Sequence, residues 1–230
     1  MRAVLAGEVS TSDRRLSAAG EQVVPGIELH VRGRGRFVSR GGLKLERALD
    51  TFAIAVDDLR CLDVGCSTGG FTDCLLKRGA AHVVAVDVGR AQFSWELRQD
   101  ERVELLERTN ACELPSLRPD LVGTIDLAVS DVSFTSVLTV LPAMLALLGS
   151  EGHIVMLVKP QFEAPRTDVG AGGIVRDPAV RAAAVDKVKS ALEEAGLSIL
   201  GCCESPITGH KGNVEYLLAA TVAEGSPLLR

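Results

Sequence analysis

From residue 60 onward, short apolar runs rich in β-branched residues alternate with segments of helical periodicity. This alternation is typical of a parallel sheet covered by helices on both faces, and it predicts a doubly wound α/β domain. The predicted strands are 61–64, 82–88, 103–107, 125–130 and 153–158, and helices are expected at 71–79 and 134–149.

A further helix is predicted to start at Pro178, with Asp177 as its cap, and to end at Gly196. Two apolar runs, 197–204 and 214–222, follow it with a connection too short for a helical crossover. We therefore expect an antiparallel pair of strands at the sheet edge.

The N-terminal part of the chain has a different pattern. A helix is predicted over 41–52, but residues 1–31 contain only short strand-like pieces with turn signals, too few to form a core of their own. We therefore expect a short N-terminal segment with a linker, residues 1–36, and one large domain, residues 37–230.

Charge supports this division. The chain has a net charge of −5, yet its first 49 residues contain nine Lys or Arg and only five acids. A basic segment attached to an acidic domain is typical of phosphate binding, and a solvated basic face explains the charge equally well. The candidate RNA-binding residues precede the helix over 41–52 and are Arg32, Arg34, Arg36 and Arg40.

Several classes of protein are disfavoured. The longest apolar run, 137–148, is interrupted by Thr139 and Pro142 and is shorter than the roughly 20 residues that span a bilayer. The N-terminus lacks a secretory signal, and the six cysteines include no C-x-x-C pair. We therefore expect a cytoplasmic protein with no membrane partner, no metal site and no disulfide framework.

The segment CLDVGCSTGGFT, residues 61–72, combines a strand, an acid, a glycine-rich turn and a helix. Glycines at the carboxyl end of such a strand let the backbone approach a ligand closely. Neither the dinucleotide spacing G-x-G-x-x-G nor a P-loop is present. Asp63 would repel a pyrophosphate, but it suits a ligand with an ammonium group and a sulfonium.

Two polar residues follow the next strands. Asp87 ends the second strand, where a carboxylate can accept hydrogen bonds from both ribose hydroxyls, and Asn110 follows the third, where it can contact adenine. This order of residues predicts S-adenosylmethionine as the cofactor. The expected cofactor-binding residues are Asp63, Gly65, Ser67, Gly69, Gly70, Asp87, Asn110 and Asp131.

The chain resembles the TlyA group of FtsJ-like methyltransferases, whose members are often called hemolysins. The resemblance rests on FVSRGGLKLERAL (37–49), CLDVGCSTGGFT (61–72), ERTNA (107–111), SDVSF (130–134), VKPQFE (158–163), GGIVRDP (172–178) and GNVEYLL (212–218). It implies a Rossmann-like sheet of seven strands with the last one antiparallel. It also implies 2′-O-methylation of RNA ribose, at cytidine in ribosomal RNA, with ribosomal RNA or ribosomal subunits as partner.

The resemblance also implies four catalytic residues, namely Lys44, Asp131, Lys159 and Glu215. Lys159 is expected to act as the base or to position the ribose hydroxyl, with Asp131 and Glu215 as its partners and Lys44 as an auxiliary cation. The family usually begins with a complete RNA-binding module of the ribosomal-protein-S-four type, of which residues 3–31 match only the second half.

Three functions stay open at this point. SDVSF replaces the Asn/Asp-Pro-Pro-aromatic motif of amino-group methyltransferases and the Pro-Cys of carbon-five enzymes, which favours oxygen methylation. The family label suggests a membrane-damaging hemolysin instead, although no amphipathic pore segment or lipid anchor is present. The third alternative is a protein that binds the cofactor and RNA without turnover. The motifs predict no oligomeric state.

Overall fold

The computed structural model describes residues 4, 9–11, 14, 16, 18, 20–31 and 35–223. The chain divides into two units, residues 1–36 and residues 37–230. In the first unit, strands β1 (Val9–Ser10) and β2 (His30–Val31) pair antiparallel. An RNA-binding role for this unit stays a prediction.

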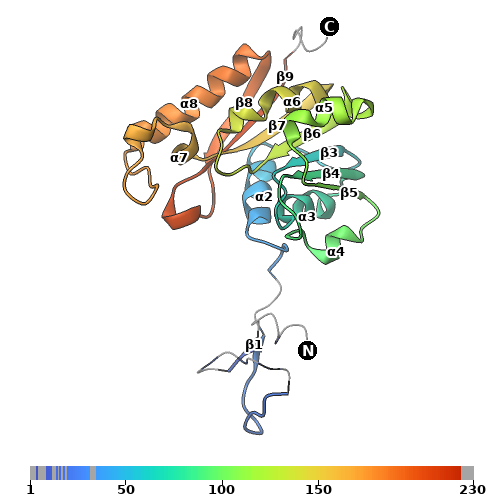
Figure 1. Cartoon of the computed structure of the whole chain (residues 1–230), viewed down its shortest axis with the longest axis vertical. Coiled ribbons are helices and arrows are strands. Elements are labelled where there is room, and N and C mark those ends of the chain that lie inside the picture. The colour runs from blue at the N-terminus through green and yellow to red at the C-terminus, as the bar shows by residue number, and fades with distance from the viewer. Residues whose placement is uncertain are drawn as a thin grey trace. The chain divides into compact units, whose positions relative to one another are not determined.

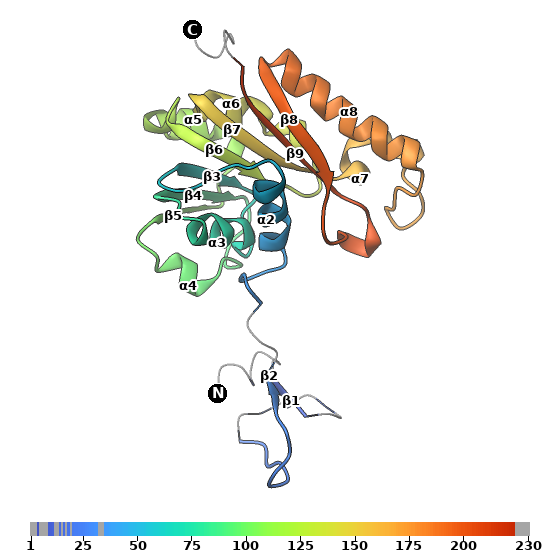
Figure 2. The ribbon, with the colours of Figure 1, turned by 180° about the vertical axis from the view of Figure 1, so that it is seen from behind.

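The second unit is built on a seven-stranded sheet in the order β5-β4-β3-β6-β7-β9-β8 (Figures 1 and 2). Strand β9 runs antiparallel to both of its neighbours, and the other adjacent strands are parallel, which confirms the predicted sheet with a reversed final strand. The strands are β3 (Arg60–Val64), β4 (His82–Asp87), β5 (Val103–Glu107), β6 (Ile125–Ser130), β7 (Leu148–Val158), β8 (Leu197–Glu204) and β9 (Tyr216–Val222).

Helices cover both faces of this sheet (Figures 1 and 2). One core packs under α5, α6 and α8, and the other packs under α2, α3 and α4. Strand β3 contributes Leu62 to the first core and Cys61 to the second, so both faces of this strand are covered. The helices are α2 (Gly41–Thr51), α3 (Gly70–Lys77), α4 (Trp95–Arg98), α5 (Leu114–Leu117), α6 (Leu141–Leu147), α7 (Pro160–Glu163) and α8 (Pro178–Glu194).

The single helix predicted over 134–149 is wrong in its extent. A 3₁₀ turn, Val137–Thr139, precedes α6, and Pro142 lies in the first turn of α6. Proline has no N–H to continue a preceding helix, so α6 starts afresh beside it. At the other end, Leu148 already pairs with Ile125, so β7 begins there rather than at residue 153.

Helix α8 begins as the sequence predicts. The side chain of Asp177 accepts a hydrogen bond of 2.8 Å from the Ala179 N–H, and Pro178 occupies the first turn. Within the part of the chain that the structure describes, no helix combines the length and the apolar character needed to cross a membrane.

Candidate active site

A cavity of about 700 Å³ opens at the carboxyl ends of the central strands, where open α/β sheets bind their ligands. The glycine-rich turn after β3 forms part of its wall. All four residues expected to be catalytic line it: Lys44, Asp131, Lys159 and Glu215.

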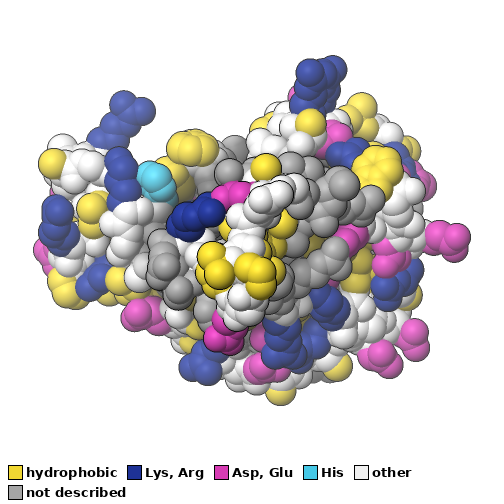
Figure 3. Space-filling model, turned by 90° about the horizontal axis from the view of Figure 1, so that it is seen from below, with side chains coloured by type: hydrophobic (Ala, Val, Ile, Leu, Met, Phe, Trp, Pro, Cys, Tyr) yellow, Lys and Arg dark blue, Asp and Glu magenta, His cyan; other side chains and the backbone are white. Residues whose placement is uncertain are grey.

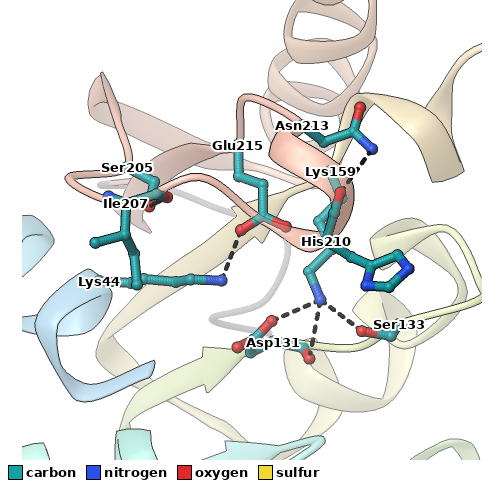
Figure 4. A network of polar contacts seen from close by, with 9 residues as sticks. All are labelled: Lys44, Asp131, Ser133, Lys159, Ser205, Ile207, His210, Asn213 and Glu215. Atoms are coloured by element: carbon teal, nitrogen blue, oxygen red, sulfur yellow. Dashed lines mark hydrogen bonds and ion pairs between the residues drawn. The ribbon is translucent and has the colours of Figure 1, made fainter. Parts of the chain in front are cut away.

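Lys159 and Asp131 form an ion pair in this cavity. They directly follow β7 and β6, which are adjacent parallel strands, so their side chains start from the same edge of the sheet. The Lys159 Nζ lies 2.7 Å from Asp131 Oδ1, and it donates to the Ser133 hydroxyl at 2.7 Å and to the Asp131 carbonyl at 3.4 Å (Figure 4). Three oxygens therefore hold the Lys159 ammonium, whose side chain is 7% exposed.

Lys44 and Glu215 form a second, more deeply buried pair (Figure 4). The Lys44 Nζ donates to Glu215 Oε2 at 2.6 Å, and the two side chains are 11% and 3% exposed. Glu215 was expected to partner Lys159, but it binds Lys44 because α2 packs beside β9. The four residues are thus two ion pairs rather than one lysine with two carboxylates.

Two residues that the sequence analysis missed support this arrangement. A side chain at Gly209 would place its Cβ 1.9 Å from Glu215 Oε1 and would displace that carboxylate from its present position. Ser133, as described above, accepts a hydrogen bond from Lys159. Both belong to loops without hydrophobic periodicity, and only the membership of Ser133 in SDVSF pointed to it.

Asp63 lies near the end of β3 and is fully buried. Its Oδ2 accepts hydrogen bonds from the Thr72 N–H at 2.9 Å and the Thr72 hydroxyl at 2.6 Å, whereas Oδ1 has no hydrogen-bond partner among the described residues. Burial raises the pKa of Asp63 to about 7; the Thr72 hydrogen bonds lower it, and the charges of Asp131 and Asp87 raise it. A buried carboxyl with an unused oxygen fits a cationic group nearby.

Backbone conformation and close packing require glycine at several positions of the glycine-rich turn. Gly65 and Gly69 have φ angles of +80° and +93°, a region that favours glycine. An added Cβ would lie 3.2 Å from Val132 at Gly65 and 2.3 Å from the Ser39 Oγ at Gly70. Gly65, Gly70 and the exposed Ser67 line the cavity, so a ligand can reach their backbone.

Asp87 and Asn110 lie farther along the same edge of the sheet and do not line the cavity. Asp87 accepts hydrogen bonds from the Ser67 N–H at 2.8 Å and the Gly89 N–H at 2.7 Å. The Asn110 side chain accepts one from the Cys112 N–H at 3.1 Å. Each carboxylate oxygen has a second lone pair, so Asp87 can still accept ribose hydroxyls. This donor set fits a nucleoside cofactor with an ammonium group.

Of the four candidate RNA-binding arginines, the structure describes two. Arg40 is exposed and lines the cavity, whereas Arg36 is exposed and belongs to the first unit. Arg32 and Arg34 lie outside the described residues. Across the described ranges, no group of three or more His, Cys, Asp or Glu side chains is arranged to hold a metal ion.

Residues 37–222 match the model of a protein family described as FtsJ-like methyltransferase. The chain belongs to this family. It is 53% identical over 183 residues to the 16S/23S rRNA (cytidine-2′-O)-methyltransferase TlyA of Mycobacterium tuberculosis, a match that covers 79% of this chain and 67% of that protein. This FtsJ-like chain is therefore a methyltransferase by family.

Two further matches carry the hemolysin name. Hemolysin A of Brachyspira hyodysenteriae is 40% identical, and the match covers 93% of this chain and 89% of that protein. A solved structure from Streptococcus thermophilus, described as a hemolysin, is 41% identical with a TM-score of 0.79 and covers 97% of this chain and 82% of its own.

Proposed function

We propose that this FtsJ-like methyltransferase transfers a methyl group from S-adenosylmethionine to a ribose 2′-hydroxyl of ribosomal RNA, at cytidine as in the related TlyA enzyme. The observation that carries the proposal is the pair of buried lysine–carboxylate contacts in one cavity beside the glycine-rich turn. Taking four charged side chains out of water is costly, which a purely structural role would not require.

The cofactor would be held along the edge formed by β3, β4 and β5. Asp63 supplies a buried carboxyl for the ammonium group, Asp87 accepts the ribose hydroxyls, and Asn110 contacts the adenine. The backbone of the turn, with Gly65, Ser67, Gly69 and Gly70, and the side chain of Asp131 complete the proposed set. When bound, S-adenosylmethionine supplies an electrophilic methyl group on a sulfonium.

The lysine–carboxylate pairs would prepare the acceptor. A ribose hydroxyl is a poor nucleophile, so it must be oriented and must lose its proton as the new bond to carbon forms. Lys159 is already paired with Asp131, so its ammonium is suited to donate to the hydroxyl oxygen and fix its position. The Asp131 carboxylate can then accept the hydroxyl proton. Lys44, held by Glu215, adds positive charge to the same cavity.

Labelled methyl transfer to ribosomal subunits tests this proposal. The protein is incubated with methyl-labelled S-adenosylmethionine and subunits that lack the modification, and the RNA is then digested with alkali. A 2′-O-methyl group removes the hydroxyl that attacks the adjacent phosphate, so we expect label in alkali-resistant dinucleotides. Label in single nucleotides would instead indicate base methylation, and no transfer would indicate a binding protein without turnover.

The hemolysin name calls for its own control. Purified protein is mixed with red cells over the concentration range that gives methyl transfer. We expect no release of haemoglobin. Lysis by wild-type protein, retained in Lys159→Ala, would favour a membrane-damaging activity independent of the cavity.

A further inference from the structure

Two loops form one side of the cavity mouth, residues 166–176 after α7 and residues 209–213 after β8, and we refer to them together as the basic lip. Gly172, Gly173, His210 and Lys211 of these loops line the cavity. In Figure 3, Lys and Arg side chains lie on the lobe at the left, which is the side of α7 and α8 in Figure 1.

The two loops of the basic lip are fastened to each other. Asn213 is buried, and its side-chain oxygen accepts from the Val175 N–H at 3.1 Å, while its amide nitrogen donates to the carbonyls of Gly173 at 2.8 Å and His210 at 3.2 Å. The Lys211 Nζ donates to the Gly172 carbonyl at 3.2 Å. These contacts hold both loops in one arrangement beside the cavity.

The basic lip carries three exposed cations, Arg166, Arg176 and Lys211. Among the described residues, none of the three forms an ion pair with a carboxylate. The neighbouring acids are engaged elsewhere, because Asp168 accepts from the Thr167 hydroxyl and Asp177 caps α8.

Three arginines at the far edge of the sheet are paired instead, although Arg90 and Arg108 at the same edge form no ion pair among the described residues. Around β5, Arg98 binds Glu107 at 2.9 Å, and Arg102 binds Asp100 at 2.8 Å. Arg118 binds Asp120 at 2.6 Å and also contacts Glu104. A carboxylate partner cancels most of the field of an arginine, so the cations of the basic lip, which lack such partners, leave positive charge beside the cavity.

We propose that the basic lip binds the phosphate backbone of the RNA strand that carries the target nucleotide. Guanidinium groups match phosphate oxygens in geometry and charge, and a fixed loop loses little entropy when it binds them. Arg166 and Arg176 each neutralise one phosphate, and Lys211 neutralises a third at the cavity wall. This inference rests on the proposed function, since it takes RNA as the substrate.

The test compares Arg166→Ala/Arg176→Ala with Arg102→Ala/Lys189→Ala, which removes the same charge away from the cavity. RNA binding is measured over a salt series with subunit RNA. For two phosphates on a single strand, we expect the basic-lip variant to flatten the slope of log affinity against log salt by about 1.4 units. The control variant should keep the wild-type slope, and Arg166→Lys/Arg176→Lys should restore most of it.

Methyl transfer in the same variants separates this inference from the proposed function. At saturating RNA, we expect the basic-lip variant to transfer methyl groups within about twofold of wild type, since it keeps all groups that touch the reacting atoms. If wild type methylates RNA but the basic-lip variant keeps the full salt slope, the inference is overturned and the proposed function stands. If wild type binds RNA with a slope that depends on the lip but transfers no methyl group, the proposed function fails and the inference stands. If wild type does not bind RNA, both fail.

Discussion

The carboxylates in the two halves of the site are held in different ways. Asp63 and Asp87 accept hydrogen bonds from groups at most 20 residues away, all within residues 63–89. Asp131 and Glu215 instead contact lysines that are 28 and 171 residues away in the sequence. The proposed cofactor half is thus a product of one local strand–helix–strand unit, whereas the proposed methyl-accepting half depends on the topology of the whole sheet.

The largest effect on stability is expected from removing one partner of the more deeply buried ion pair, Lys44–Glu215. Glu215→Ala leaves the Lys44 ammonium without its carboxylate, and losing one partner of a buried ion pair costs about 3–5 kcal/mol. We expect that decrease in the free energy of unfolding in urea. Asp131→Ala should cost less, because the Asp131 side chain is 23% exposed and Lys159 keeps Ser133.

A double variant provides the control for this prediction. Lys44→Met/Glu215→Leu removes both charges, so most of the stability lost in Glu215→Ala should return. Equal losses in the free energy of unfolding in Glu215→Ala and Asp131→Ala would contradict the prediction that the more deeply buried ion pair contributes more to stability.

The local half predicts a smaller effect, confined to the cofactor. Asp87→Ala removes the carboxylate proposed to accept the ribose hydroxyls, at a cost of about 1.5–3 kcal/mol in binding free energy. Calorimetric titration with S-adenosylmethionine measures it, with Asp50→Ala, an exposed carboxylate paired with Arg78, as the matched control. Unchanged affinity in a folded Asp87→Ala variant would remove Asp87 from the cofactor site.

The pH dependence of stability, whose change per pH unit is smaller than either effect above, tests Asp63. Its pKa in the folded chain is about 7, above the roughly 3.9 of an unfolded aspartate. The folded chain therefore keeps a proton that the unfolded chain releases between these values. The free energy of unfolding should fall as pH rises through this window, by at most about 1.4 kcal/mol per pH unit.

Asp63→Asn isolates this contribution from the other titrating groups. The difference in stability between wild type and Asp63→Asn should change between about pH 4 and pH 7 and be constant above that window. Urea unfolding of both proteins at several pH values measures it. A difference that does not vary with pH would show that Asp63 has an ordinary pKa in the folded chain.

The same contrast explains which parts of the fold and of the site could be predicted from the sequence. The strand, turn and helix around Asp63 form one contiguous motif, and the structure has them where the pattern predicts. The pairing of Glu215 with Lys44 could not be predicted, because it requires β9 to lie between β7 and β8 and α2 to pack beside it. Hydrophobic periodicity predicts neither the order of these strands nor the helix that packs beside β9.

Local patterns also missed features that depend on single polar contacts. The helix predicted over 134–149 is divided, and the Glu163 carboxylate fixes the start of the 3₁₀ turn by accepting from the Val137 N–H at 2.7 Å. Asn213 joins two loops that are far apart in the sequence. Such residues look like ordinary loop or turn residues until the fold places their partners beside them.

Single-turnover methyl transfer by Lys159→Ala, at saturating RNA and S-adenosylmethionine, tests the account most directly. Lys159→Ala removes the ammonium that Asp131 and Ser133 hold in the cavity, and Lys189→Ala removes an exposed lysine from α8 as the control. We predict that the rate falls by about a hundredfold or more in Lys159→Ala, with cofactor affinity unchanged, and stays at the wild-type value in Lys189→Ala. A Lys159→Ala rate within a few-fold of wild type would contradict the assignment of these ion pairs to catalysis.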